Sequence, residues 1–155
     1  MSIAWIYLDK KAAAVSALHD YADMDFIIDN TPDDIADVRS KMTAIKAPVI
    51  SKLPKSIPDP HAGEERLVSQ IDEIDVLKER YRRALEYMSW FRPAWDALTD
   101  DERYILQEFF IRDGVSKTTA VLNISYRIHV ERAQAYRYKD KALARLALLL
   151  FGIGK

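Results

Sequence analysis

The chain has 155 residues, 49% of them apolar and 30% charged, a formal net charge of −1 and no cysteine. This is the composition of an ordinary globular protein, and it excludes disulfides, cysteine nucleophiles and cysteine-ligated zinc. The longest apolar run, residues 146–151, is far shorter than the roughly 20 residues that span a bilayer, and the first residues lack a secretory pattern. We therefore expect a cytoplasmic protein with no membrane partner.

Glycine is scarce, and the β-branched residues are scattered instead of alternating along strands. Both features predict an all-α fold. Four segments are expected: an N-terminal pair of helices at 1–45, a Pro-rich linker at 46–63, a long central helix with a Trp/Pro joint at 64–97, and a helix-turn-helix domain at 98–152.

The N-terminal segment predicts two helices. Asp9 can cap the first, which runs through the alanines at 12–14 to Ile28 and stops at Asp29–Asn30. Thr31–Pro32 predicts the start of the second, because a capping hydroxyl precedes a proline at the first helical position. Apolar residues then follow at helical steps along one narrow stripe: Ile35, Val38, Met42 and Ile45.

Prolines at 48, 54, 58 and 60 make residues 46–63 a linker, because they can neither continue a helix nor sit in a central strand. The longest helical pattern follows from Glu64 to about Arg92, with a near-heptad stripe of Leu67, Ile71, Ile74, Leu77, Tyr81, Leu85 and Met88. This stripe either packs on the N-terminal helices or joins two subunits as a homodimer. Pro93 is expected to end the helix, within a hydrophobic joint of Trp90, Phe91 and Trp95.

The last third of the chain has the order of parts of a helix-turn-helix. Thr99 and Glu102 form a capping-box pattern, and the helix that they begin yields at Arg112–Gly114. A second helix is expected between Ser116 and Ile128, and a long third helix from about Glu131 to Leu150. Residues 116–145 hold seven basic and two acidic residues. This charge indicates either a polyanion partner or a solvated helix face.

These residues resemble a known family. Residues 98–106 (LTDDERYIL), the glycine turn, the second helix and the basic third helix are similar to region 4 of sigma-70-type factors, which reads a promoter element. Residues 131–146 (ERAQAYRYKDKALARL) look more specifically like the end of phage-encoded sigma-like regulators of Gram-positive hosts, of the late-transcription and autolysin type. The resemblance implies a transcriptional regulator of phage or prophage genes, with double-stranded DNA and RNA polymerase as partners.

Two registers are open for the start of the third helix. In one, residues 122–125 form the turn and Ser125 caps a helix that begins with Tyr126 and Arg127. In the other, residues 128–131 form the turn and the helix begins near Glu131. The second register is preferred because it buries Ala135 at a position where the first would bury a histidine.

In either register, side chains in the first turns of the third helix can enter the major groove, where arginine bonds guanine and glutamine bonds adenine. Arg132 and Gln134 are the base-reading candidates. Arg137, Lys139, Lys141 and Lys117 are expected on phosphates. Tyr136 either bonds a phosphate through its hydroxyl or lies in the core or on the flank of the site. Arg127 joins the set in the first register.

Enzymatic chemistry is not expected. The three histidines are scattered, and neither a phosphate-binding loop nor a nucleophile motif occurs, so we expect no catalytic residue, metal or cofactor. Two alternatives to the regulator remain: a DNA-packaging adaptor resembling a small terminase subunit, and a module that binds RNA polymerase without DNA specificity of its own.

Overall fold

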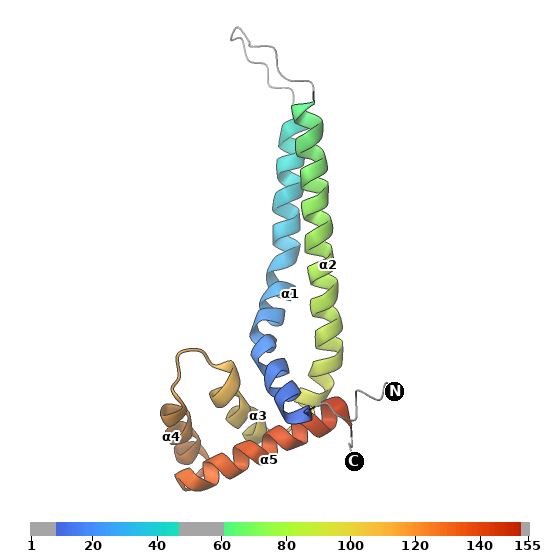
Figure 1. Cartoon of the computed structure of the whole chain (residues 1–155). Coiled ribbons are helices and arrows are strands. Elements are labelled where there is room, and N and C mark those ends of the chain that lie inside the picture. The colour runs from blue at the N-terminus through green and yellow to red at the C-terminus, as the bar shows by residue number, and fades with distance from the viewer. Residues whose placement is uncertain (1–8, 47–60, 153–155) are drawn as a thin grey trace. The chain divides into compact units, whose positions relative to one another are not determined.

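The computed structural model describes residues 9–46 and 61–152, and all regular structure in these ranges is helical (Figure 1). The elements are α1 (Lys10–Lys46), α2 (Ala62–Asp96), α3 (Asp100–Leu106), the π-helical segment η2 (Gln107–Ile111), α4 (Lys117–Ile128) and α5 (Arg132–Phe151). The predicted all-α class is confirmed. The chain forms two compact units: unit 1 comprises Met1–Met24 and Tyr87–Lys155, and unit 2 comprises Asp25–Glu86.

Helix α1 begins as the sequence predicts and then differs. The Asp9 carboxylate accepts a hydrogen bond from the Ala12 amide at 3.1 Å. The break predicted at Asp29–Asn30 is wrong, because α1 is continuous and contains Pro32. An interior proline removes one helical hydrogen bond and costs about 3 kcal/mol. Burial of Thr31 within unit 2 favours continuation, and the Asn30 amide donates to the Phe26 carbonyl at 2.8 Å.

Helix α2 extends past both of its predicted ends. It begins at Ala62, inside the predicted linker at 46–63, of which residues 47–60 lie outside the described residues. The end predicted at Pro93 is also wrong, because the helix continues to Asp96. Ala94 and Trp95 are both buried, so the packing of one more helical turn outweighs the missing proline donor.

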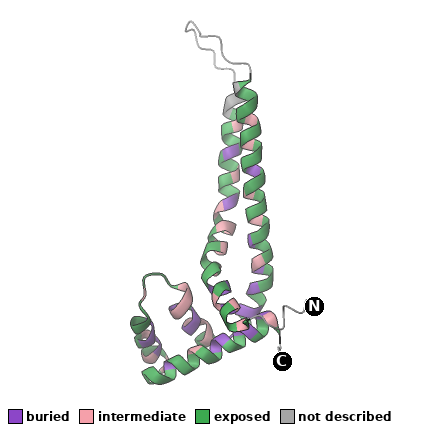
Figure 2. Ribbon diagram, in the orientation of Figure 1, coloured by how far each residue is buried: buried purple, intermediate pink, exposed green. Residues whose placement is uncertain are grey.

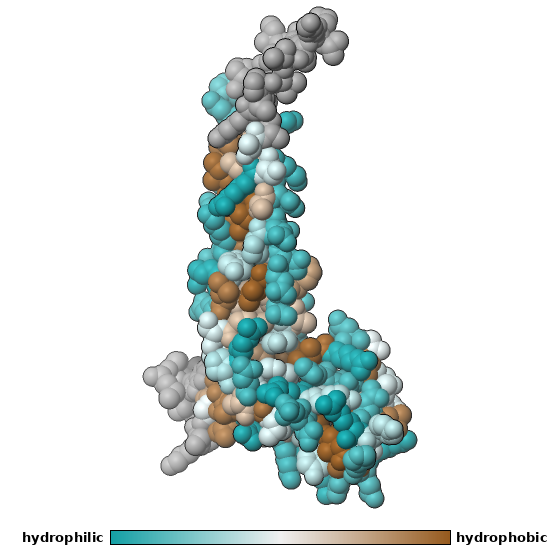
Figure 3. Space-filling model, turned by 180° about the vertical axis from the view of Figure 1, so that it is seen from behind, coloured by the Kyte–Doolittle hydropathy of each residue, from teal (hydrophilic) through white to brown (hydrophobic). Residues whose placement is uncertain are grey.

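In unit 2 the two long helices lie side by side and run in opposite directions (Figure 1). Val38 of α1 and Ile74 and Ala84 of α2 are buried there. Other apolar residues of the unit remain exposed: Phe26, Val68, Ile71, Val76 and Leu85. Figure 3 shows brown, hydrophobic patches among the teal surface of this unit. Only part of the predicted α2 stripe is therefore packed within the chain, and the homodimer stays a prediction.

An ion-pair network covers one exposed side of α2. The Arg82 guanidinium lies 2.9 Å from a carboxylate oxygen of Glu79 and 2.9 Å from one of Glu86, and Arg83 lies 3.1 Å from Glu79. The hydrogen bonds from Arg82, followed by those from Arg83, lower the pKa of Glu79 to about 2. All four residues are spaced as helical neighbours, so the network stabilises the helix itself.

Arg82→Ala is expected to raise the Glu79 pKa toward 4.5, the value of a carboxyl without partners, because the largest cause of the shift is removed. A lowered pKa means that the stabilisation by this carboxylate is complete above pH 4.5 and is lost as the pH falls toward 2. A carboxyl NMR titration measures the pKa directly. Arg80→Ala, at an exposed neighbouring site, is the control and should leave it unchanged. A Glu79 pKa near 4.5 in the unchanged protein would contradict the network.

The core of unit 1 is built around Phe91, which has no exposed surface. Its ring centroid lies 5.3 Å from those of Tyr21 and Tyr87, and 5.8 Å from that of Trp95. The Tyr87 hydroxyl donates to the Ala17 carbonyl, and burial, followed by a nearby carboxylate charge, raises the Tyr87 pKa above its usual range. The predicted hydrophobic joint is confirmed for Phe91 and Trp95.

The same core extends along α5. Five buried residues of that helix belong to it, spaced at helical steps: Ala142, Leu143, Leu146, Ala147 and Leu150. Figure 2 shows buried, purple segments along α5. Leu149 is exposed, as is Trp90 of the predicted joint, whose ring lies 5.6 Å from that of Phe151. The C-terminal half of α5 is therefore held by the core of unit 1, and its N-terminal half carries the candidate site.

Candidate nucleic-acid interface

Helix α3 starts with the predicted capping box. The Thr99 hydroxyl accepts from the Glu102 amide at 3.2 Å, and the Glu102 carboxylate accepts from the Thr99 amide at 3.0 Å. The helix then widens into η2, which the sequence pattern did not indicate. The expected turn is confirmed at Gly114, whose φ of 75° lies in the left-handed region that favours glycine.

A buried carboxylate ties η2 to α4. Glu108 is only 5% exposed, and its oxygens accept from the Arg112 guanidinium at 2.8 Å and from the Asn123 amide at 3.2 Å. Buried charges are costly unless they are paired in this way. We had not singled out Glu108 from the sequence. The signal that could have found it is the spacing of Glu108 and Arg112, four residues apart on a helix.

Helix α4 is followed by a three-residue connection to α5. Ser116 caps α4 by accepting from the Thr119 amide at 3.1 Å. The helix ends at Ile128, His129 adopts the left-handed conformation with a φ of 59°, and α5 begins at Arg132. A turn of three or four residues is typical of the helix-turn-helix motif.

The helix boundaries decide between the two registers. Ser125 lies inside α4, where its hydroxyl donates to the Val130 carbonyl, so the register in which Ser125 starts the third helix is wrong. Glu131 is the N-cap residue of α5, as the preferred register requires, although its side chain makes no capping bond. The αL turn at His129 had no clear sequence signal, because glycine usually occupies such positions.

The rotation of α5 is set by its buried residues. Ala135 has no exposed surface and packs with Ile105, Val121 and Ile124, in a cluster that joins α3, α4 and α5. Four exposed residues of α5 line one open polar hollow and are called the outer face: Gln134, Arg137, Tyr138 and Lys141. The outer face therefore brings together three of the predicted site residues and adds Tyr138.

The other predicted residues lie elsewhere on unit 1. Arg132, Tyr136, Lys117 and Arg127 are exposed but outside the outer face. The Arg127 guanidinium lies 4.2 Å from the ring centroid of Tyr104, and the Tyr136 ring is 5.9 Å from that of Phe109. Lys117 and Arg127 belong to α4, and Arg132 and Tyr136 to the first turns of α5.

Two basic residues of α5 are engaged within the chain. The Lys139 ammonium lies 3.6 Å from Asp140 and 5.2 Å from the ring centroid of Phe109. The Arg145 guanidinium lies 3.3 Å from Glu102. By contrast, none of the ion pairs among the described residues involves Arg137 or Arg132. The remaining basic residues of α5, Arg132, Arg137 and Lys141, all lie in the N-terminal half of the helix.

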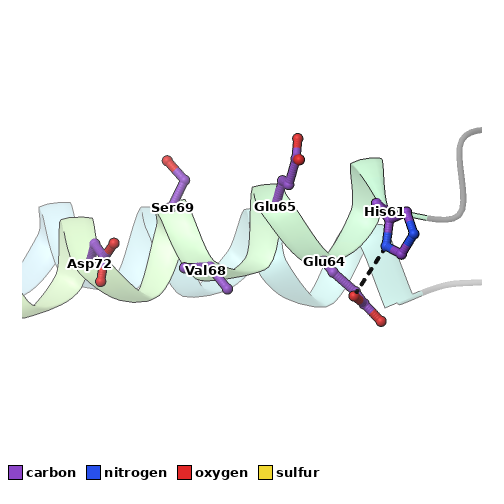
Figure 4. A pocket seen from close by; sticks show the side chains of 6 residues that line it. All are labelled: His61, Glu64, Glu65, Val68, Ser69 and Asp72. Atoms are coloured by element: carbon purple, nitrogen blue, oxygen red, sulfur yellow. Dashed lines mark ion pairs between the residues drawn. The ribbon is translucent and has the colours of Figure 1, made fainter.

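A second open hollow lies on the first turns of α2, in unit 2 (Figure 4). Glu64, Glu65 and Asp72 make it acidic, and His61 lies 3.8 Å from Glu64. A polyanion would be repelled there.

Within residues 9–46 and 61–152, no group of three or more His, Asp or Glu side chains is arranged to hold a metal ion, and no helix is long and apolar enough to cross a membrane.

Comparisons of the chain with protein-family models, with curated proteins and with solved structures give no match.

Proposed function

We propose that the chain is a sequence-specific DNA-binding protein in which α4, the turn at 129–131 and α5 act as a helix-turn-helix. The observation that carries the proposal is the outer face of α5. It gathers an arginine, a lysine, a glutamine and a tyrosine in the N-terminal half of the helix, away from the buried Ala135. A helix of this width fits the major groove, and these side chains supply the donors that bind base edges and phosphates.

The supporting helices suit such a role. The cluster around Ala135 and the hydrogen bonds of Glu108 fix α5 against α3, η2 and α4, so the outer face is presented by rigid elements. Lys117 lies in the first turn of α4, where a phosphate would meet both its charge and the helix N-terminus. The sequence resemblance to sigma region 4 supports a regulator of transcription of phage or prophage genes.

Fluorescence anisotropy with a pool of labelled duplexes of random sequence tests the proposal. We expect binding at low salt, with an affinity that falls steeply as salt rises, because three or four phosphate contacts give a log–log slope of about −3 to −4. Absence of binding at low salt, or binding that does not respond to salt, would contradict the proposal. RNA polymerase retained by a chain that binds no duplex would instead identify a polymerase-binding module.

A packaging adaptor is the second candidate, and the exposed apolar residues of unit 2 favour it. Ile71 and Leu85 belong to the near-heptad stripe of α2 yet remain uncovered within the chain, so they are available for self-association. The mass of the protein in solution separates the candidates. A ring of many subunits identifies the adaptor, whereas a monomer or dimer supports the regulator.

A further inference from the structure

We propose that Arg137, and not Arg132, reads bases together with Gln134. This assignment rests on the proposed DNA binding. It specifies which side chains of α5 contact bases and so determine the preferred DNA sequence. It differs from the roles predicted from the sequence, in which Arg132 reads a base and Arg137 holds a phosphate. The difference comes from the rotation of α5, which the residue order alone does not give.

The helical positions separate the two arginines. Successive residues of an α-helix are turned by about 100°, so Gln134 and Arg137, three apart, share one side, whereas Arg132 lies roughly 200° from Gln134. The packing of Ala135 and Ala142 turns the Gln134 side outward. Gln134 and Arg137 accordingly line the same hollow, to which Arg132 does not contribute.

The side of α5 that carries Arg132 adjoins η2, and Arg132 itself is exposed at the start of the helix. Lys139 lies seven residues later, about two helical turns along the same side. Its ammonium is directed to the ring of Phe109 in η2, at 5.2 Å, and to that of Tyr136, at 5.5 Å. Arg132 therefore lies on the flank of the reading surface, where a DNA backbone passes beside the helix end, and it is suited to a phosphate.

The guanidinium of Arg137 is available to bind guanine. It is exposed, and it takes part in none of the ion pairs of the described residues, so its guanidinium can bond both major-groove acceptors of guanine. The neighbouring Lys141 ammonium lies 5.8 Å from the ring centroid of Tyr138, which leaves it directed along the outer face. Gln134 supplies the paired donor and acceptor that adenine requires.

The length of the outer face limits the element that it reads. Gln134 and Lys141 are seven residues apart, which is about 10 Å along the helix axis, or roughly three base pairs at 3.4 Å each. We infer a reading element of this size that contains a guanine opposite Arg137 and an adenine opposite Gln134, with Arg132 and Lys117 on phosphates outside it.

The test uses a duplex that the full chain selects from the random pool. It is compared with a series of copies, in each of which one guanine of the element is replaced by 7-deazaguanine. This base lacks the N7 acceptor. At one position the replacement should weaken binding of the unchanged protein about tenfold. Arg137→Ala should weaken binding of the normal duplex by a similar factor and should no longer respond to the replacement.

Arg132→Ala is the matched control. It should weaken both duplexes equally and remain sensitive to 7-deazaguanine, as a phosphate contact does. An Arg137→Ala protein that is still sensitive, or an Arg132→Ala protein that is insensitive, would overturn the assignment. Failure of the unchanged protein to bind any duplex would contradict the DNA-binding proposal itself, so the two failures are distinguishable.

Discussion

Phe91→Ala is expected to lower the free energy of unfolding of unit 1 by about 3–5 kcal/mol, the usual cost of removing a fully buried phenylalanine. Phe91 is completely buried, and its ring contacts those of Tyr21, Tyr87 and Trp95. The truncation removes all three aromatic contacts, each of which adds about 0.5–1.5 kcal/mol to the burial of area. No small side chain can fill the space that remains, because the surrounding helices are joined at this point.

Urea unfolding followed by circular dichroism measures this loss. Phe26→Ala is the matched control, because the same side chain is 64% exposed in unit 2 and its removal should change stability by less than about 0.5 kcal/mol. A second variant, Phe91→Leu, retains most of the volume and should cost clearly less than Phe91→Ala. Equal losses for Phe91→Ala and Phe26→Ala would contradict the position of Phe91 in the core.

Local signals in the sequence predicted the C-terminal helices well. The capping box of Thr99 and Glu102 and the glycine turn at Gly114 act within a few residues of chain, so their outcome depends little on distant packing. The second helix was likewise expected between Ser116 and Ile128, and α4 spans Lys117–Ile128.

The two prolines show where local reasoning failed. Thr31–Pro32 has the pattern of a helix start, and Pro93 that of a helix end, yet both prolines lie inside long helices. A local sequence pattern shows that a proline removes about one helical hydrogen bond. It does not show how much the burial of the next helical turn stabilises the fold. That gain depends on residues such as Leu18 and Trp95, which are far apart in sequence and adjacent only in the fold.

The sequence predicted which residues belong to the candidate site. It did not predict how they are arranged, because the arrangement depends on how α5 packs in the fold. The sequence indicated a basic third helix with two possible starts, and Ala135 was the reason to prefer the later one. Its complete burial then fixed which side chains face outward. The contacts of Lys139 with Phe109, and of Arg145 with Glu102, join residues 30 to 43 positions apart, so no local pattern could show that these charges are engaged.

The second large effect is expected for DNA affinity. Arg137→Ala combined with Lys141→Ala removes two available charges from the outer face, and each contact is worth about 1–2 kcal/mol at low salt, so the affinity should fall on the order of 100-fold. Both side chains are exposed, and both line the same hollow. The double variant should therefore fold normally, which circular dichroism can confirm.

The most direct measurement compares this double variant with Lys78→Ala/Arg80→Ala, which removes the same number of charges from exposed positions of α2. Anisotropy titrations with one duplex at a fixed low salt concentration should show the roughly 100-fold loss for the α5 variant and less than about a threefold loss for the α2 variant. Equal losses for the two variants, or no loss for either, would contradict the claim that the outer face of α5 binds DNA.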